Sequence, residues 1–103
     1  MEFQGFDWDD ANTLKSLKKH GVSQNTIEEF FHKPFWTGPD PRHSTIEERF
    51  IAVGRGESGR PMFVVFTFRM KEGLKLLRPI SARYMHAKEV MRYEKEFAKI
   101  EKR

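Results

Sequence analysis

The segment Met62–Phe68 is a nearly continuous apolar run that is rich in valine and phenylalanine. Its β-branched and aromatic residues are typical of a strand buried in the middle of a sheet. Three glycines in Gly54–Gly59 predict a hairpin turn before this run, and Lys71-Glu72-Gly73 predicts a second turn after it. The chain must therefore build an antiparallel sheet around this central strand.

The neighbouring strands are predicted to begin at Glu48 and to cover Leu74–Ala82. Pro79 has no backbone N–H, so it favours either an edge position or a β-bulge for the second of these strands. Alternating aromatic residues in Phe3–Trp8 predict another short strand. The proline- and glycine-containing segment Thr37–Pro41 is interpreted as a loop.

Two helices are expected between the first strand and that loop. Asp9 or Asp10 is a suitable cap for the first helix, which continues through Leu14 and Leu17 and ends at Gly21. Ser23 is a suitable cap for the second helix, which ends at Pro34. The apolar side of this second helix consists of Ile27, Phe30 and Phe31.

The last segment, Met85–Lys102, is predicted to form one helix. Its apolar stripe consists of Val90, Tyr93, Phe97 and Ile100, at helical spacing. The predicted fold class is α+β: an N-terminal strand and two helices, a three-stranded antiparallel meander and a C-terminal helix. Residues 1–103 are predicted to form a single domain, in which helices cover one sheet face and the other face is left partly to solvent or to a partner.

Composition and charge narrow the possible functions. The chain has no cysteine, which excludes disulfides, thiolate nucleophiles and cysteine zinc sites. It has no apolar run of the ~20 residues that span a bilayer and no signal-peptide pattern, so a cytoplasmic protein is expected. Residues 1–50 have a net charge of −3 and residues 51–103 one of +7, counted from their Lys, Arg, Asp and Glu residues. The basic half favours a polyanion or an acidic protein as partner.

Familiar catalytic patterns are missing from the sequence. The histidines are His20, His32, His43 and His86, and no two of them have the spacing of metal ligands on one helix. No phosphate-binding glycine loop follows a strand, and no serine nucleophile motif is present. Neither a metal nor a cofactor is expected. What remains is a set of arginines near strand ends, namely Arg49, Arg69, Arg78 and Arg83, each of which is also explained as a solvated strand end.

RNA is a substrate for which such cations are chemically sufficient. Its own 2′-hydroxyl can attack the adjacent phosphorus, so the protein has to orient that hydroxyl, relay protons and stabilise the charge on the phosphorane oxygens. Arginine and lysine supply this electrostatic stabilisation, and a general base adds ~10²–10⁴-fold. The segment Lys18-Lys19-His20-Gly21 fits such a site, although it is equally explained as a helix end whose cations complement the helix dipole.

The order of several short motifs resembles the BrnT-type ribonuclease toxins. The motifs are Trp8-Asp9, Asn12, Lys19-His20-Gly21-Val22-Ser23, Asp40-Pro41-Arg42-His43-Ser44, the stretch from Glu48 to Gly54, Val64, Val65, Thr67, Arg69, Ile80-Ser81-Ala82-Arg83, Glu89 and Tyr93. The likeness covers about residues 3–95. Each motif is weak alone, and their shared order and spacing make the match fairly specific.

The resemblance implies a RelE-like fold and a metal-independent ribonuclease that inhibits translation. It implies a cognate antitoxin as partner in a hetero-oligomer, contact with DNA only indirectly through that antitoxin, and no membrane partner. His20, Arg49 and Arg78 are expected to bind RNA or phosphate, Arg78 as one of the arginines near strand ends. The catalytic residues that the resemblance implies are Lys19, Glu48, Arg69 and Arg83. Among these, Arg69 and Arg83 are expected to bind phosphate and stabilise the transition state, and Glu48 or Lys19 to transfer protons, with His20 and His43 as second choices.

Two other functions are compatible with the sequence. One is a non-catalytic module, such as a degenerate toxin, that uses its basic half to bind RNA or an acidic protein. The other is a structural subunit of a hetero-oligomer. The first function predicts that the chain binds RNA without cleaving it. The second predicts that the chain binds a protein partner tightly and neither binds nor cleaves RNA.

Overall fold

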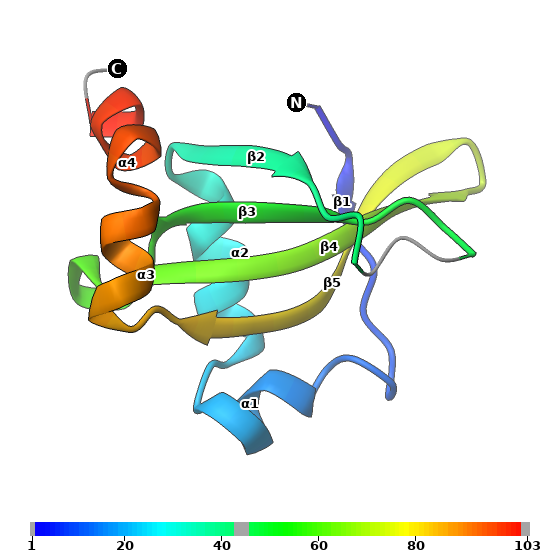
Figure 1. Cartoon of the computed structure of the whole chain (residues 1–103). Helices are drawn as coiled ribbons and strands as arrows, with labels where there is room; N and C mark the ends of the chain where they lie inside the picture. Colours follow the sequence, from blue (N-terminus) through cyan, green and yellow to red (C-terminus); the bar gives the residue numbers. More distant parts are fainter. Residues whose placement is uncertain (1, 43–45, 102–103) are drawn as a thin grey trace.

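The computed structural model describes residues 2–42 and 46–101 of the chain. Its sheet has five strands in the order β1-β5-β4-β3-β2, with helices on both sides (Figure 1). The strands are β1 (Gly5–Phe6), β2 (Phe35–Pro39), β3 (Phe50–Arg55), β4 (Pro61–Lys71) and β5 (Leu74–Tyr84). The helices are α1 (Lys15–His20), α2 (Gln24–His32), α3 (Ala87–Arg92) and α4 (Glu94–Glu101), and a 3₁₀ turn, Glu57–Gly59, joins β3 to β4.

The strand pairing confirms the predicted α+β class and the central position of the apolar run. Strands β2, β3, β4 and β5 pair antiparallel in sequence order, whereas β1 pairs parallel to β5. The prediction of a loop at Thr37–Pro41 was wrong for most of this segment. All five residues of β2 pair with β3, from Phe35 opposite Gly54 to Pro39 opposite Phe50. A proline is tolerated there because β2 is an edge strand.

Helix α2 packs on one face of the sheet, and the hydrophobic core lies between the helix and the sheet (Figure 1). Its predicted cap is confirmed, because the Ser23 side chain accepts a hydrogen bond from the Thr26 backbone N–H at 3.2 Å. The core consists of Val22, Ile27, Phe30 and Phe31 on the helix side and Ala52, Met62, Val64, Phe66, Leu77 and Ala82 on the sheet side. The predicted apolar side of this helix is therefore correct.

Helix α1 is shorter than predicted. It begins at Lys15 rather than after Asp9 or Asp10, and Gly21 ends it in the left-handed conformation as predicted, with a φ of 67°. The preceding segment is held in a turn by the buried Asn12 side chain. Its amide donates to the carbonyl oxygens of Asp7 and Pro79, and its oxygen accepts from the Asp9 N–H.

Of the two alternatives for Pro79, the β-bulge is confirmed and the edge position is wrong. Strand β5 lies between β1 and β4, and its register with β4 shifts between Val65 and Phe66. Val65 pairs with Ser81 and Phe66 with Pro79, so Ile80 is the extra residue. The bulge removes the need for a ladder hydrogen bond from the proline nitrogen.

The single C-terminal helix predicted over Met85–Lys102 is two helices in the structure. Helices α3 and α4 meet at Tyr93, whose ψ of 18° departs from helical geometry. The break allows the Tyr93 ring to pack edge-on against Phe63, while Phe97 and Ile100 of α4 are buried. None of these helices, nor any other in the described residues, has the length and apolar character needed to cross a bilayer.

Candidate functional site

The sheet face opposite α2 carries an open cleft of about 660 Å³. It is framed by α1, by the segment that follows β2 and by α3 (Figure 1). Its floor consists of Ile51 of β3, Phe63 and Val65 of β4, and Ile80 and Ser81 of β5. The bulge at Ile80 brings two consecutive side chains of β5 to the cleft, where a regular strand would present only one of them.

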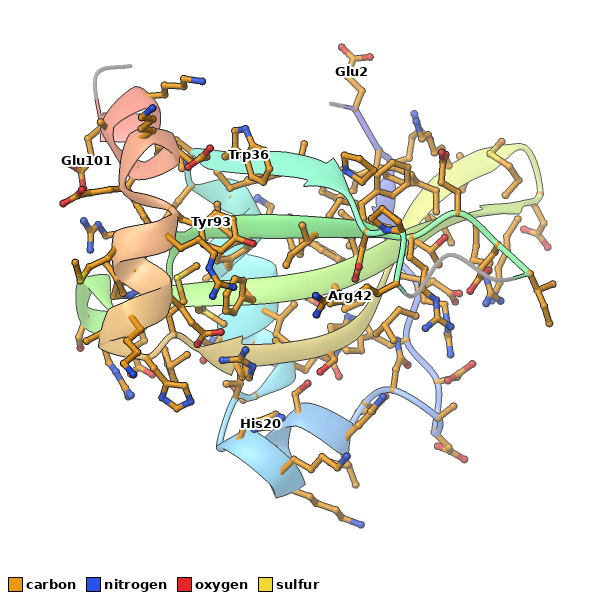
Figure 2. The ribbon with its side chains drawn as sticks, in the orientation of Figure 1. Glu2, His20, Trp36, Arg42, Tyr93 and Glu101 are labelled. Atoms are coloured by element: carbon orange, nitrogen blue, oxygen red, sulfur yellow. The ribbon has the colours of Figure 1, made fainter. Side chains whose placement is uncertain are left out.

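The rim of the cleft is strongly cationic. Its lysines and arginines are Lys15, Lys19, Arg42, Arg49, Arg83 and Arg92, and its carboxylates are Asp40 and Glu89. Figure 2 shows Arg42 and Tyr93 on the cleft side of the sheet and His20 at the end of α1. Lys15, Lys19, Arg42 and Arg92 form no ion pair with any residue in the described ranges. Four cations around one concavity, with no carboxylate partner in the part of the chain that the structure describes, favour the binding of an anion.

Arg83 and Glu89 are fixed to one another inside the cleft. The two Arg83 terminal nitrogens donate to the two Glu89 carboxylate oxygens at 2.8 and 2.7 Å, and one of these nitrogens also donates to the Tyr84 carbonyl. The guanidinium lies 4.7 Å from the centre of the Phe63 ring. This two-point contact fixes the plane of the guanidinium before any ligand binds.

The same contact sets the protonation of both groups. The hydrogen bond from Arg83 lowers the pKa of Glu89 to about 2, against the partial burial that raises it, and the His86 N–H donates to the same carboxylate. The hydrogen bond from Glu89 raises the pKa of Arg83. Glu89 is therefore a carboxylate at neutral pH and a weak proton acceptor, which suits a residue that positions Arg83.

The cleft gathers four of the seven residues that were predicted from the sequence to be functional, namely Lys19, His20, Arg49 and Arg83. Arg49 also lies near Glu47, at 3.6 Å between Nη2 and Oε1. Glu48 lines a different hollow beside Phe50, Thr67 and Lys75. Consecutive residues of an extended chain point to opposite sides, which explains why Arg49 reaches the cleft and its neighbour Glu48 does not.

The other two arginines lie away from the cleft lining. Arg69, farther along β4, forms an ion pair with Glu47 at 3.2 Å. Arg78 is buried and bonds to Asp7 and Asp9 at 3.3 and 3.0 Å. Burial raises the pKa of Asp7, but the hydrogen bonds and charges of Lys71 and Arg78 outweigh it, so that its pKa lies below the usual value. Arg78 therefore joins β5 to the segment after β1. The second-choice residue His43 lies outside the described residues.

Sequence reasoning did not assign roles to several residues of the cleft. Arg42, Glu89 and Tyr93 belong to the resembling motifs, and Lys15 and Arg92 belong to none of them. The spacing of Lys15 and Lys19 was an available signal, because residues four apart share one side of a helix. The sequence contains no comparable signal for Arg92, which reaches the cleft because the chain turns back after β5.

The described residues contain no group of three or more His, Cys, Asp or Glu side chains that could hold a metal ion.

A small α+β fold with a cationic cleft on one face of its mixed sheet is suited to bind a polyanion. The family model of the ribonuclease toxin BrnT of type II toxin–antitoxin systems matches residues 8–89. The chain therefore belongs to this family of ribonuclease toxins. Among curated proteins, none matches the chain significantly. The matched range contains the whole cleft lining except Arg92 and Tyr93.

Proposed function

We propose that this chain, over residues 1–103 as one toxin domain, is an endoribonuclease that cleaves RNA in the cationic cleft without a metal. The observation that carries the proposal is the convergence of six cationic side chains on one open cleft, four of them with no ion pair among the described residues. An RNA strand carries one phosphate per nucleotide, and such a surface attracts it through charge.

The proposed reaction is a transesterification within the RNA. The 2′-oxygen forms a bond to phosphorus as the bond to the 5′-oxygen breaks, which leaves a 2′,3′-cyclic phosphate and a 5′-hydroxyl. Arg83 and Arg49 are assigned to the phosphorane oxygens, because both are permanently charged and Arg83 is already oriented. His20 accepts the 2′-proton, and a protonated group of the rim such as Lys19 donates to the 5′-oxygen.

The proposed biological effect is inhibition of translation in the cytoplasm, neutralised by a cognate antitoxin. Membership of a type II toxin family supports this partner. We expect expression of the chain alone to arrest growth, and we expect co-expression of a small protein encoded by an adjacent gene to restore it. Growth that is unaffected by the folded chain alone would contradict the toxin activity.

The decisive experiment is cleavage of bulk RNA by the purified, antitoxin-free chain in EDTA, with and without ribosomes. We expect cleavage to continue in EDTA and to yield 2′,3′-cyclic phosphate ends. The Arg83→Gln/Glu89→Gln double variant should cleave at least about 100-fold more slowly, since it lacks the oriented cation without leaving a carboxylate unpaired.

The matched control is Arg55→Gln/Glu101→Gln, which removes an ion pair from outside the cleft. It should cleave at the rate of the unaltered chain. Equal cleavage by both double variants would remove Arg83 from the site. A folded chain that binds RNA and cleaves none, even on ribosomes, would instead support the non-catalytic module. Two observations favour this alternative: Glu48 lies outside the cleft, and the low pKa of Glu89 makes it a weak proton acceptor.

A further inference from the structure

Two aromatic side chains lie side by side at one end of the cleft. Trp36 of β2 and Tyr93, between α3 and α4, have ring centroids 6.2 Å apart with an interplanar angle of 47°. The Tyr93 ring also packs in a T-shaped arrangement with Phe63 of the cleft floor, with centroids 5.4 Å apart. Figure 2 shows both rings on the cleft side of the sheet, next to α4. Both residues remain partly exposed to solvent.

The Trp36 ring lies along its own strand, and Gly38 makes this possible. A Cβ atom at position 38 would lie 2.6 Å from the Cη2 atom of the Trp36 indole, so any side chain there would force the indole or the strand to shift. The six-membered part of the indole therefore rests over the backbone of Gly38, in the direction of Pro39 and Asp40. These two residues line the cleft. The indole thus lies outside the hydrophobic core cluster and beside Tyr93 at the border of the cleft.

The position of the two rings suits a flat ligand attached to a phosphate. Tyr93 itself lines the cleft, as do Arg83 and Arg92. The bases of single-stranded RNA stack on aromatic rings while their phosphates contact neighbouring cations. The joint presence of an aromatic pair and neighbouring cations is typical of surfaces that bind single-stranded nucleic acid.

We propose that Trp36 and Tyr93 form a stacking site for a nucleobase of single-stranded RNA whose phosphates occupy the cleft. The inference rests on the proposed function and adds to it the form of the substrate: an unpaired strand with a base next to the bound phosphates. Stacking uses the π face that every base has, so this site tolerates different bases. A purely structural role, in which Tyr93 only joins α4 to the sheet, predicts no dependence on the base.

The test uses the fluorescence of Trp36 and an RNA that cannot be cleaved. Trp8, the other tryptophan, donates its indole N–H to Glu28 of α2, so Trp8→Phe leaves Trp36 as the single fluorescent indole. The probes are a short 2′-O-methyl oligonucleotide and an abasic oligonucleotide of equal length and charge. We expect the first to quench Trp36 emission and the second to cause no quenching and to bind about 5- to 100-fold more weakly.

Substitutions identify which rings carry the effect. Trp36→Leu and Tyr93→Leu should each weaken the oligonucleotide with bases and leave the abasic one unchanged. The matched control is Tyr84→Leu, because Tyr84 lies against Arg60 and does not line the cleft. Its affinity ratio between the two probes should equal that of the unaltered chain.

The possible outcomes separate this inference from the proposed function. Equal binding of the two probes, or equal weakening of both by Tyr93→Leu, would overturn the stacking site even if RNA is cleaved. Base-dependent binding by a chain that cleaves no RNA would support the stacking site and contradict the ribonuclease proposal. Failure of the chain to bind either probe would contradict both.

Discussion

At the scale of single residues, the cleft combines one cation that is fixed in advance, Arg83, with four that form no ion pair within residues 2–42 and 46–101. Arg83 is fixed by Glu89, whereas Lys19 extends from a surface helix without an ion pair among the described residues. The fixed cation gives a constant geometry, which transition-state stabilisation needs. Cations such as Lys19 attract a phosphate, because no carboxylate of the described residues has to be displaced when the phosphate binds.

The Arg83–Glu89 pair has a measurable effect on stability as pH falls. The pKa of Glu89 in the folded chain is about 2, below its ordinary value of 4.5. The stabilisation is therefore complete above about pH 4.5 and is lost as pH falls toward 2. Because the Arg83 side chain is 36% exposed, solvent screens the pair, and we expect it to contribute about 1 kcal/mol. Urea unfolding of Glu89→Gln should show that loss at pH 7 and a smaller one at pH 3. Equal losses at the two pH values would contradict the assignment.

We predict that Asn12 is important for the stability of the fold, although it does not line the cleft. Its side chain is buried and bonds to two carbonyl groups and one N–H, one of the carbonyls belonging to Pro79 in the bulge. Asn12→Ala leaves these groups without partners, so we expect a loss of about 2 kcal/mol in the free energy of unfolding. Asn25→Ala, which changes an exposed asparagine of α2, is the control and should cost less than about 0.5 kcal/mol in the same denaturation experiment.

At the scale of elements, local sequence patterns predicted most strands of the sheet. They failed where contacts between distant residues determine the secondary structure. The strands β3, β4 and β5 and the cap of α2 follow from periodicity and turn residues alone. Strand β2 was missed because Gly38 and Pro39 are turn formers, and only its pairing with β3 makes them extended. The break at Tyr93 was missed because the stripe from Val90 to Ile100 has regular helical spacing, and the packing of Tyr93 on Phe63 interrupts it.

The end of α1 provides a prediction about a whole element. Gly21 has a φ of 67°, and no atom lies within 4 Å of the place where its Cβ would be. Gly21→Ala therefore costs only the backbone strain of the left-handed conformation, about 1 kcal/mol, and Gly21→Asn should cost less. Thermal unfolding of both variants tests whether Gly21→Ala is more destabilising than Gly21→Asn. The opposite order would mean that a side-chain contact, and not the backbone, determines the residue at this helix end.

At the scale of the whole molecule, the fold combines cations from both halves of the sequence. Lys15, Lys19, Arg42 and Arg49 come from the half with net charge −3, and Arg83 and Arg92 from the half with +7. The charge imbalance along the sequence therefore indicated a polyanion but not the location of its site. The family resemblance marked four residues that do meet in the cleft. The sequence alone could not exclude Glu48, Arg69 and Arg78, because the direction of these side chains depends on strand faces and ion pairs that only the folded chain has.

The location of charge, and not its amount, should therefore control RNA affinity. Each phosphate contact with a single strand contributes about −0.7 to the slope of log K against log salt concentration. Lys19→Gln/Arg42→Gln removes two cations of the cleft, and we expect the slope to become less steep by about 1.4. The measurement is fluorescence anisotropy of a 2′-O-methyl oligonucleotide over a series of salt concentrations.

The control for this experiment changes the net charge by the same amount at other positions. Lys18→Gln/Lys99→Gln removes two exposed cations, from α1 and α4, that do not line the cleft. Its slope should match that of the unaltered chain, since charges outside the contact region release no counterions from the RNA. If the two double variants change the slope equally, the chain attracts RNA through its overall charge, and the cleft is not where the phosphates bind.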